Sequence, residues 1–458
     1  MQTSHANSKP EAGWLLRELV GSSSAADSEP TSDKPAVVKQ ASQRDKFFPQ
    51  APQTPEDLGI RASDVAALVL RTLMSRDGQS GRQIAQQVRV SLPILESFVR
   101  SMRDDKLLSV RKASGAVDYE YELTDRGLEA AKRANQSTTY SGSAPVCVDD
   151  YLESLRRQSL SQCRVTPDTL KTALGDLRFD AATINKVGQA MVGGKAMLVH
   201  GAPGNGKTSV AQRLTSAYSR GVWIPRAVSF SGMIARIYDP LVHNELEPPV
   251  EAKREIDQRW IFVSRPSVVV GGELTLESFE FALDRQTGLL ETPLQLKANC
   301  GVLVIDDFGR QRVNPTEILN RLIVPLESRF DILTLPNGRS VRLPFEQLLV
   351  LSTNLEPSDL VEEAFMRRIP YKIRVQDPSV TEFRKLFERI ARSLGLACEP
   401  TVIDYLISTH YERPQRPLRF CHARDLLSLI CNACAFNGLP PVVTVELLNE
   451  AVGNYFDD

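Results

Sequence analysis

One eight-residue segment constrains the fold of this chain more than any other. Residues 201–208 read Gly-Ala-Pro-Gly-Asn-Gly-Lys-Thr and match the phosphate-binding loop (P-loop) pattern GxxxxGK[ST]. A short apolar run at 197–200 has the length of a strand and leads into the loop. Apolar residues then recur at helical spacing at Val210, Leu214, Ala217 and Tyr218. A strand, a glycine-rich loop and a helix in this order predict an α/β fold with a parallel sheet.

The residue types of this loop suit a nucleoside triphosphate. Glycines let backbone N–H groups curl around phosphates, and the start of the following helix adds the positive end of its dipole. Lys207 is expected to reach the β- and γ-phosphates, and the Thr208 hydroxyl to bind Mg²⁺. The predicted ATP-binding residues are Gly201, Ala202, Pro203, Gly204, Asn205, Gly206, Lys207, Thr208 and Ser209. The alternative is a glycine-rich turn with a surface lysine, which the flanking strand and helix argue against.

Two further strands end in polar side chains that suit hydrolysis. The apolar run 302–305 is followed by Asp306 and Asp307. Asp306 is expected in the Mg²⁺ shell, and Asp307 is expected to orient or deprotonate the attacking water. The run 348–351 leads to Asn354, whose amide would contact the water and the γ-phosphate. The alternative for Asp306 and Asp307 is a strand that simply ends in polar turn residues.

Taken together, the motifs resemble those of AAA+ ATPases. P-loop, acidic strand and strand-terminal Asn are followed by EAFMRRIPYKI and by a helical stretch that contains CHARDLL. The resemblance implies that Asn354 is the first sensor residue and that Arg367 and Arg368 are the arginine fingers. It implies that Arg424 is the second sensor, with Arg419 nearby as a competitor. Because a finger of this family completes the site of the neighbouring subunit, a ring-shaped homo-oligomer is implied.

This resemblance covers roughly residues 165–456, and the chain departs from it at one position. Most of the family carries Asp-Glu where this chain has Asp306 and Asp307, and aspartate is shorter by one methylene. Helicase-loader relatives of the DnaC and IstB type carry the same pair. The long insert between 219 and 300 is similar to inserts of MoxR-type proteins that face a pore or a partner. Within it, packing is expected for Trp260 and exposure for His243.

After about residue 378 the pattern is all-helical and predicts an α-helical lid. The first helical stripe is Val380, Phe383, Phe387, Ile390 and Leu394. Cys431 and Cys434, with Cys421 and His422 upstream, raise the alternative of a zinc site. Cysteines three apart inside a helical run are more often small core residues, and a structural zinc needs four ligands.

A small domain before the motor resembles a winged helix-turn-helix. Helical patterns at 82–88 and from residue 91 are followed by β-like runs at 107–111 and 117–123, joined by a turn at 113–115. Thr124 is expected to cap a last helix. Residues 61–136 hold 13 Lys and Arg against 10 Asp and Glu, a net charge of only +3. Such modules bind double-stranded DNA or dock proteins, and this charge leaves both alternatives open.

The remaining features bound the organisation of the chain. Residues before 61 are rich in Ser, Pro, Gln and Ala, which predicts disorder, with one apolar stripe from Trp14 to Val20. The predicted domains are a tail at 1–60, the winged helix at 61–136, a linker at 137–150, the AAA+ ATPase domain at 151–377 and the lid at 378–458. The 458 residues carry a net charge of −1. The chain as a whole is therefore not basic, and its net charge gives no indication that it binds nucleic acid or an anionic membrane. The apolar runs are too short to cross a membrane.

The sequence thus predicts an ATP-binding and ATP-hydrolysing AAA+ ATPase that uses Mg²⁺. Seven cysteines, an odd number, and no secretory signal favour a cytoplasmic protein. We expect an oligomer that remodels an unknown protein or nucleoprotein client. The alternative is a nucleotide-gated regulator whose winged helix binds DNA. A third alternative is an assembly scaffold that binds ATP without hydrolysing it, because the Asp307 side chain is shorter than the glutamate that most of the family carries.

Overall fold

The structure is a computed structural model. It describes residues 47–113, 118–175, 177, 179–218, 221–250, 256–360 and 366–456. The Trp14 stripe and the turn at Ser114 and Gly115 therefore lie outside the described residues. None of the described helices combines the length and the hydropathy that a membrane span requires.

The elements of the first domain follow the predicted order, with one short strand, β1, that the sequence did not predict. They are α1 (Ala62–Ser75), β1 (Gln79–Ser80), α2 (Gly81–Val88), α3 (Leu92–Asp104), β2 (Leu108–Ala113), β3 (Tyr119–Leu123) and α4 (Asp125–Ser137). The strands lie in the order β1-β3-β2, and both pairs are antiparallel. Ser80 starts α2 with a reciprocal capping box to Gln83, and Thr124 caps α4. These caps fix where the two helices begin.

The stretch 47–60, which the sequence assigns to a disordered tail, makes defined contacts in the structure. It contains a 3-10 turn, η1 (Glu56–Leu58), whose Leu58 side chain is fully buried. Phe47 packs edge-on against Trp260 with 5.5 Å between the ring centroids. The buried Arg259 donates to the Leu58 carbonyl at 2.9 Å. Buried apolar side chains and a paired backbone carbonyl thus order residues whose composition alone favours disorder.

The predicted linker at 137–150 is also packed. The Ala144 N–H donates to the Val88 carbonyl at 2.8 Å, and Arg71 donates to the Tyr140 carbonyl at 2.6 Å. The segment then enters β4 (Val146–Cys147), which pairs in parallel with β7 (Ala227–Phe230). Its backbone polar groups are therefore satisfied by neighbouring elements, as those of a free linker are not.

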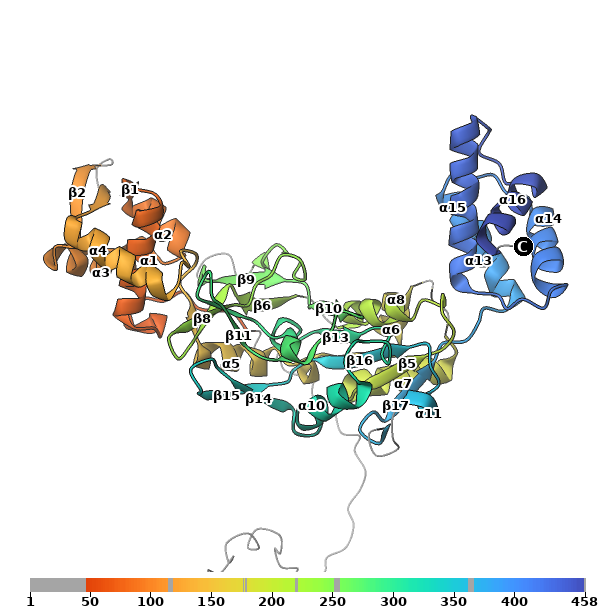
Figure 1. The fold of residues 1–458 in the computed structure, drawn as a ribbon, viewed down its shortest axis with the longest axis horizontal. Helices are drawn as coiled ribbons and strands as arrows, with labels where there is room; N and C mark the ends of the chain where they lie inside the picture. Colours follow the sequence, from red (N-terminus) through yellow and green to blue (C-terminus); the bar gives the residue numbers. More distant parts are fainter. Residues whose placement is uncertain are drawn as a thin grey trace, which may run out of the picture. The chain divides into compact units, whose positions relative to one another are not determined.

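A five-stranded parallel sheet forms the centre of the middle part of the chain, where the sequence predicts a parallel sheet. Its order is β10 (Ser267–Val270), β13 (Val302–Ile305), β16 (Leu348–Thr353), β5 (Met197–His200) and β17 (Tyr371–Arg374). Val304 packs with Val210 of α8 (Lys207–Arg213), whereas Ile305 packs with Leu319 of α10 (Pro315–Ser328). Alternate residues of one strand thus face opposite layers, and α8 and α10 lie on opposite sides of the sheet (Figure 1).

Other helices complete the layers around this sheet. They are α6 (Pro167–Leu174), α7 (Ala181–Gly193), η3 (Leu214–Ala217) and α11 (Pro357–Leu360). Asn314 caps α10 by accepting from the Thr316 N–H, and Pro325 lies inside that helix. Both features of α10 are those the sequence predicts.

The long insert and its surroundings form smaller sheets. A second sheet has the order β11 (Ala282–Asp284), β12 (Leu289–Glu291), β8 (Met233–Arg236), β7 and β4. A separate two-stranded sheet is formed by β6 (Val222–Pro225) and β9 (Trp260–Val263). Another is formed by β14 (Phe330–Thr334) and β15 (Ser340–Pro344). The connecting helical turns are α5 (Val148–Arg157), η2 (Leu160–Gln162), η5 (Leu276–Phe279) and α9 (Leu294–Lys297). Trp260 is buried, as expected.

His243 is not the exposed histidine that the sequence suggests. It is 2 % exposed, and its Nδ1 accepts from the Asp239 N–H at 3.0 Å. Its Nε2 lies 3.0 Å from the Lys297 carbonyl. Burial lowers the pKa of His243. A neutral imidazole satisfies both contacts, because Nδ1 accepts from the Asp239 N–H and Nε2 donates to the Lys297 carbonyl. These two hydrogen bonds connect the loop that contains His243 to α9.

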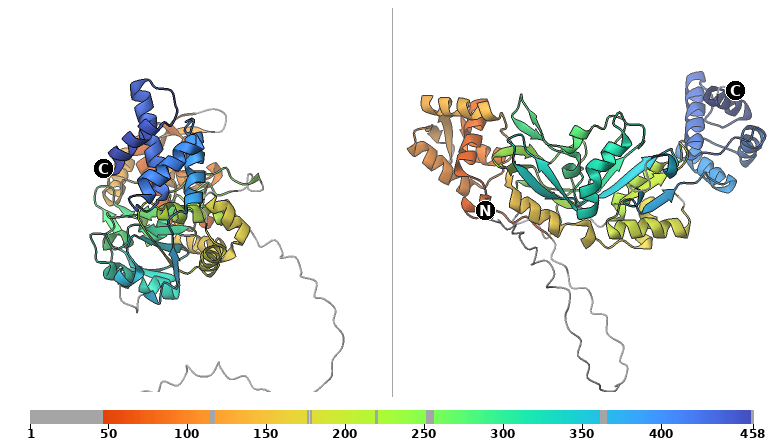
Figure 2. Two further views of the ribbon diagram at one scale, coloured as in Figure 1. Left: turned by 90° about the vertical axis from the view of Figure 1, so that its right-hand side faces the viewer. Right: turned by 60° about the horizontal axis from the view of Figure 1, so that its bottom comes forward.

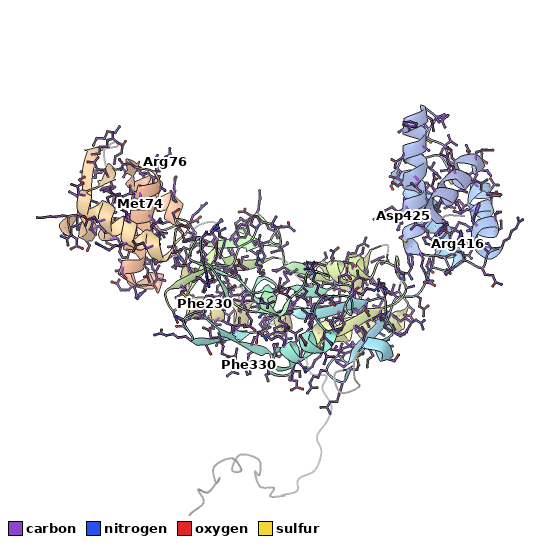
Figure 3. The ribbon with its side chains drawn as sticks, viewed as in Figure 1. Met74, Arg76, Phe230, Phe330, Arg416 and Asp425 are labelled. Atoms are coloured by element: carbon purple, nitrogen blue, oxygen red, sulfur yellow. The ribbon has the colours of Figure 1, made fainter. Side chains whose placement is uncertain are left out.

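The C-terminal part is all-helical, as predicted. Its elements are α13 (Val380–Ser393), α14 (Pro400–Ile407), the π-turn η6 (Ser408–Glu412), α15 (Phe420–Asn437) and α16 (Val445–Phe456). They share one apolar core that includes Phe383 and Phe387, and the helices lie side by side in both views of Figure 2. Arg416 stacks over the Phe456 ring, and Asp425 accepts a hydrogen bond from Tyr455 at 2.8 Å. Figure 3 labels Arg416 and Asp425 among these helices.

Candidate functional site

The P-loop leaves the carboxyl end of β5 and enters α8. Gly201, Gly204 and Gly206 have φ values of 147°, 80° and 80°, which L side chains rarely adopt. A Cβ on Gly201 would lie 2.4 Å from the Val375 carbonyl oxygen. Glycine is thus required at Gly201 both by conformation and by space, and the loop has the shape that the motif predicts.

Lys207 lies beneath this loop with three oxygen partners. Its Nζ donates to the carbonyls of Gly201 and Ala202 at 3.1 and 3.0 Å, and to Asn354 Oδ1 at 2.5 Å. Burial lowers the pKa of Lys207, and the carboxylates of Asp306 and Asp307 oppose this shift. The structure therefore brings together the lysine and the strand-terminal Asn, which are 147 positions apart.

The two residues predicted to hold a metal lie side by side. Thr208 Oγ1 donates to Asp306 Oδ2 at 2.6 Å. Asp306 is fixed by its own N–H, which donates to the Val270 carbonyl at 2.7 Å. A hydroxyl and a carboxylate are hard oxygen ligands of the kind that Mg²⁺ prefers when phosphates supply the others. The donor set thus fits the expected ion.

Asp307 and Asn354 form the second half of the site. Asn354 Nδ2 donates to Asp307 Oδ1 at 3.1 Å, while its Oδ1 accepts from Lys207. Asn354 follows β16, which pairs directly with the P-loop strand β5. The sequence predicted that neighbourhood, and the structure confirms it. One amide therefore bridges the lysine and the acid.

The lid meets the P-loop through Arg419 and Cys421, and through Asp377, which the sequence did not single out. Asp377 Oδ1 accepts from Asn205 Nδ2 at 2.6 Å and forms an ion pair with Arg419. The Cys421 N–H donates to the Gly204 carbonyl at 2.9 Å. No local pattern marks Asp377, because its partners are distant in sequence.

The structure distinguishes the two lid arginines. Arg419 caps α15 and joins the P-loop through Asp377, whereas Arg424 lies one turn further along and is exposed. The resemblance implies that Arg424 is the lid arginine at the nucleotide site. In the structure, however, Arg419 and not Arg424 lies beside the loop. The cause is helical geometry, because the start of α15 and not its second turn faces Gly204.

The two predicted fingers also differ from each other. Arg367 is exposed, whereas Arg368 Nε lies 2.6 Å from Glu327 Oε1 at the end of α10. Among the described residues no ion pair holds Arg367, whereas Arg368 would have to leave Glu327 to reach another molecule. On this ground Arg367 suits a finger better than Arg368.

A cavity of about 370 Å³ adjoins the P-loop. Its walls include Leu177, Phe179, Asn205, Asp377 and Phe420. Most of the other lining residues are polar or charged, among them Asp180, Arg374 and Glu382. The cavity thus offers both aromatic side chains on which a base could stack and polar groups that could bond its edge.

The alternative of a zinc site finds no support in the described part of the chain. There, no group of three or more His, Cys, Asp or Glu side chains is placed to hold a metal. Cys434 is buried in the lid core, and Cys431 packs against that core. His422 lies among aromatic rings and shares a hydrogen bond with Tyr411 at 3.1 Å.

Comparison with known proteins gives one family match and several similar structures. Residues 379–454 match a family described as a domain of unknown function, DUF8689. No curated protein matches the chain. The RuvB Holliday junction branch migration motor of Thermotoga maritima is 13% identical, with a TM-score of 0.34 over 66% of this chain and 74% of that one. NtrX from Brucella abortus is 13% identical, with a TM-score of 0.37 over 72% and 61%.

Proposed function

We propose that this protein binds ATP with Mg²⁺ and hydrolyses it as an AAA+ ATPase. One observation carries the proposal. Five side chains from three separate segments lie at the carboxyl edge of a parallel sheet in two hydrogen-bonded groups: Asn354 bonds both Lys207 and Asp307, and Thr208 bonds Asp306. Ligands of open α/β sheets bind at this edge.

Each group has a task that its position supports. Lys207 would exchange its carbonyl partners for phosphate oxygens, and Thr208 and Asp306 would hold Mg²⁺. The ion, when bound, would neutralise charge on the phosphate oxygens. Asp307 would orient the attacking water and accept its proton, while Asn354 holds Asp307 and Lys207 in a fixed relation. Adenine would occupy the cavity beside Asn205.

The proposal includes an oligomer that remodels a protein or nucleoprotein partner. Its support is the resemblance to AAA+ proteins of MoxR or loader character, together with the exposed Arg367. If Arg367 completes the site of a neighbouring subunit, hydrolysis per subunit must fall steeply on dilution. Arg367→Ala alone should abolish hydrolysis. In mixed oligomers an Asp307→Asn subunit, whose Arg367 is intact, should restore hydrolysis at the site of a neighbouring Arg367→Ala subunit. Activity per subunit that stays constant down to the monomer would contradict a trans-acting finger.

The second candidate is a nucleotide-gated regulator that binds DNA through the first domain. The element order of that domain, which we propose to be a winged helix, and the exposed Arg100, Arg103 and Arg111 favour it. The acidic Glu96 lies on the same helix, and the wing residue Lys112 is paired with Glu120 at 3.2 Å. Acidic residues among the arginines weaken the attraction to DNA phosphates, so we rank the DNA-binding regulator below the remodelling ATPase.

The deciding experiment is steady-state ATP hydrolysis by the purified full-length protein, with and without duplex DNA. Asp307→Asn should bind ATP as the wild type does and should not turn it over. Stimulation by DNA would favour the second candidate, and indifference to DNA would favour a protein client. Wild-type turnover that Asp307→Asn does not reduce would refute the assigned mechanism.

A further inference from the structure

The acidic turn after β13 has an unusual backbone. Asp307 has φ +48°, in the left-handed region, and Gly309 follows with φ +100°. Aspartate enters this region more readily than most non-glycine residues, but ordinary φ values remain favourable for it, so its surroundings decide whether it stays there. The question is which groups hold Asp307.

Gln311 closes this turn with both ends of its side-chain amide. Its Nε2 donates to the Asp306 carbonyl at 2.7 Å, and its Oε1 accepts from the Gly309 N–H at 2.9 Å. The two bonds span the peptide groups on either side of Asp307 and Phe308. The Arg310 N–H, which donates to the Asp307 carbonyl at 2.9 Å, tightens the turn further.

The neighbouring strand supports the same turn from the other side. Phe308 is 1 % exposed, and its N–H donates to the Ser352 carbonyl at 2.7 Å. Its carbonyl accepts from Thr353 Oγ1 at 2.7 Å. Phe308 therefore anchors the turn to β16, while Gln311 sets the conformation of the exposed residue next to it.

We propose that Gln311 is a positioning residue that holds Asp307 for catalysis. The inference rests on the proposed ATPase function. Asp307 is one methylene shorter than the glutamate that most AAA+ proteins carry at this position. Its carboxylate therefore depends on the backbone conformation to reach the water. The left-handed turn directs that carboxylate to Asn354, which also bonds Lys207. Without the clamp, Asp307 would relax to an ordinary φ and leave Asn354.

The test compares Gln311→Met, which keeps the side-chain length but removes both hydrogen bonds, with the wild type. Turnover should fall about 10- to 100-fold, because catalysis is sensitive to displacements near 1 Å. ATP affinity should stay within about twofold, since no P-loop contact is altered. The matched control is Gln286→Met, an exposed glutamine on a distant turn, which should leave both values unchanged.

A second background separates positioning from a general loss of structure. In the Asp307→Glu background the longer acid reaches the water with less help, so the fold-loss of turnover caused by Gln311→Met should be clearly smaller there than in the wild-type background. Equal losses in both backgrounds, or an unchanged turnover, would overturn the role of Gln311 while leaving the ATPase proposal intact. A wild-type protein that binds ATP without hydrolysing it would refute the ATPase proposal, and with it this one.

Discussion

The contact between the lid and the P-loop can be tested by adding one methyl group. Gly204 has φ +80°, and a Cβ there would lie 2.4 Å from Cys421 Sγ. Gly204→Ala therefore introduces left-handed strain of about 1–2 kcal/mol. It also introduces an overlap that costs about 1–3 kcal/mol where the neighbour cannot move freely. Part of this cost should appear as weaker packing of the lid on the loop.

A matched glycine isolates the overlap from the strain. Gly206 has the same φ of +80°, but the nearest atom to its added Cβ is Leu177 Cδ2 at 3.9 Å. Gly206→Ala should therefore cost only the strain. Adding Cys421→Ala to Gly204→Ala removes the sulfur and leaves Cβ 421 at 3.4 Å, an ordinary contact, so the double variant should regain about 1–3 kcal/mol.

The assay is denaturant unfolding of these variants without nucleotide, so that no phosphate contact enters the comparison. The free energies of unfolding form a double-mutant cycle for Gly204 and Cys421. A coupling energy near zero, with Gly204→Ala no worse than Gly206→Ala, would show that Cys421 does not rest on the loop. The lid contact, and the placement of Arg419 that depends on it, would then be wrong.

Two further outcomes follow from the same site and from the lid. Asp377→Asn removes a charge that competes with phosphates for Arg419, so ATP binding measured by calorimetry should tighten about two- to fivefold; weaker binding would show that Asp377 mainly holds Arg419 in place. Burial lowers the pKa of His422 from 6.5 to about 4. Its neutral form therefore contributes stability that is full above pH 6.5 and is lost towards pH 4, by about 3 kcal/mol. His422→Gln should flatten unfolding free energy across that window; an unchanged slope would exclude His422 as its source.

The central site was predictable because each part carries its own local pattern. A glycine-rich loop between a strand and a helix places Lys207 and Thr208 without knowledge of the rest of the chain. Apolar runs that end in Asp306 and Asn354 then meet them, because parallel strands share one carboxyl edge. The strand neighbourhood of β16 and β5 follows from this rule, and the structure bears it out.

The parts that were wrong or missing depend on partners far away in the sequence. Residues 47–60 and 137–150 have the composition of disordered or linking segments, yet Arg259 and Val88 supply bonds to them that composition cannot reveal. His243 has the sequence surroundings of a surface loop. In the structure it is buried and hydrogen-bonded to the carbonyl of Lys297, 54 positions away. Composition reports what a segment can do alone and not what its neighbours satisfy.

The hydrogen bonds of the P-loop imply that ATP binding is coupled to other elements. Lys207 is bonded to Asn354 at the end of β16, Asn205 to Asp377 after β17, and Gly204 to Cys421 of the lid. Phosphates that recruit Lys207 would weaken its bond to Asn354, and Asn354 also donates to Asp307, the proposed catalytic acid. Ligand binding shifts an equilibrium only by its differential affinity for the two states. We therefore expect ATP to reset Asp307 and the lid together, because the same loop residues hold both.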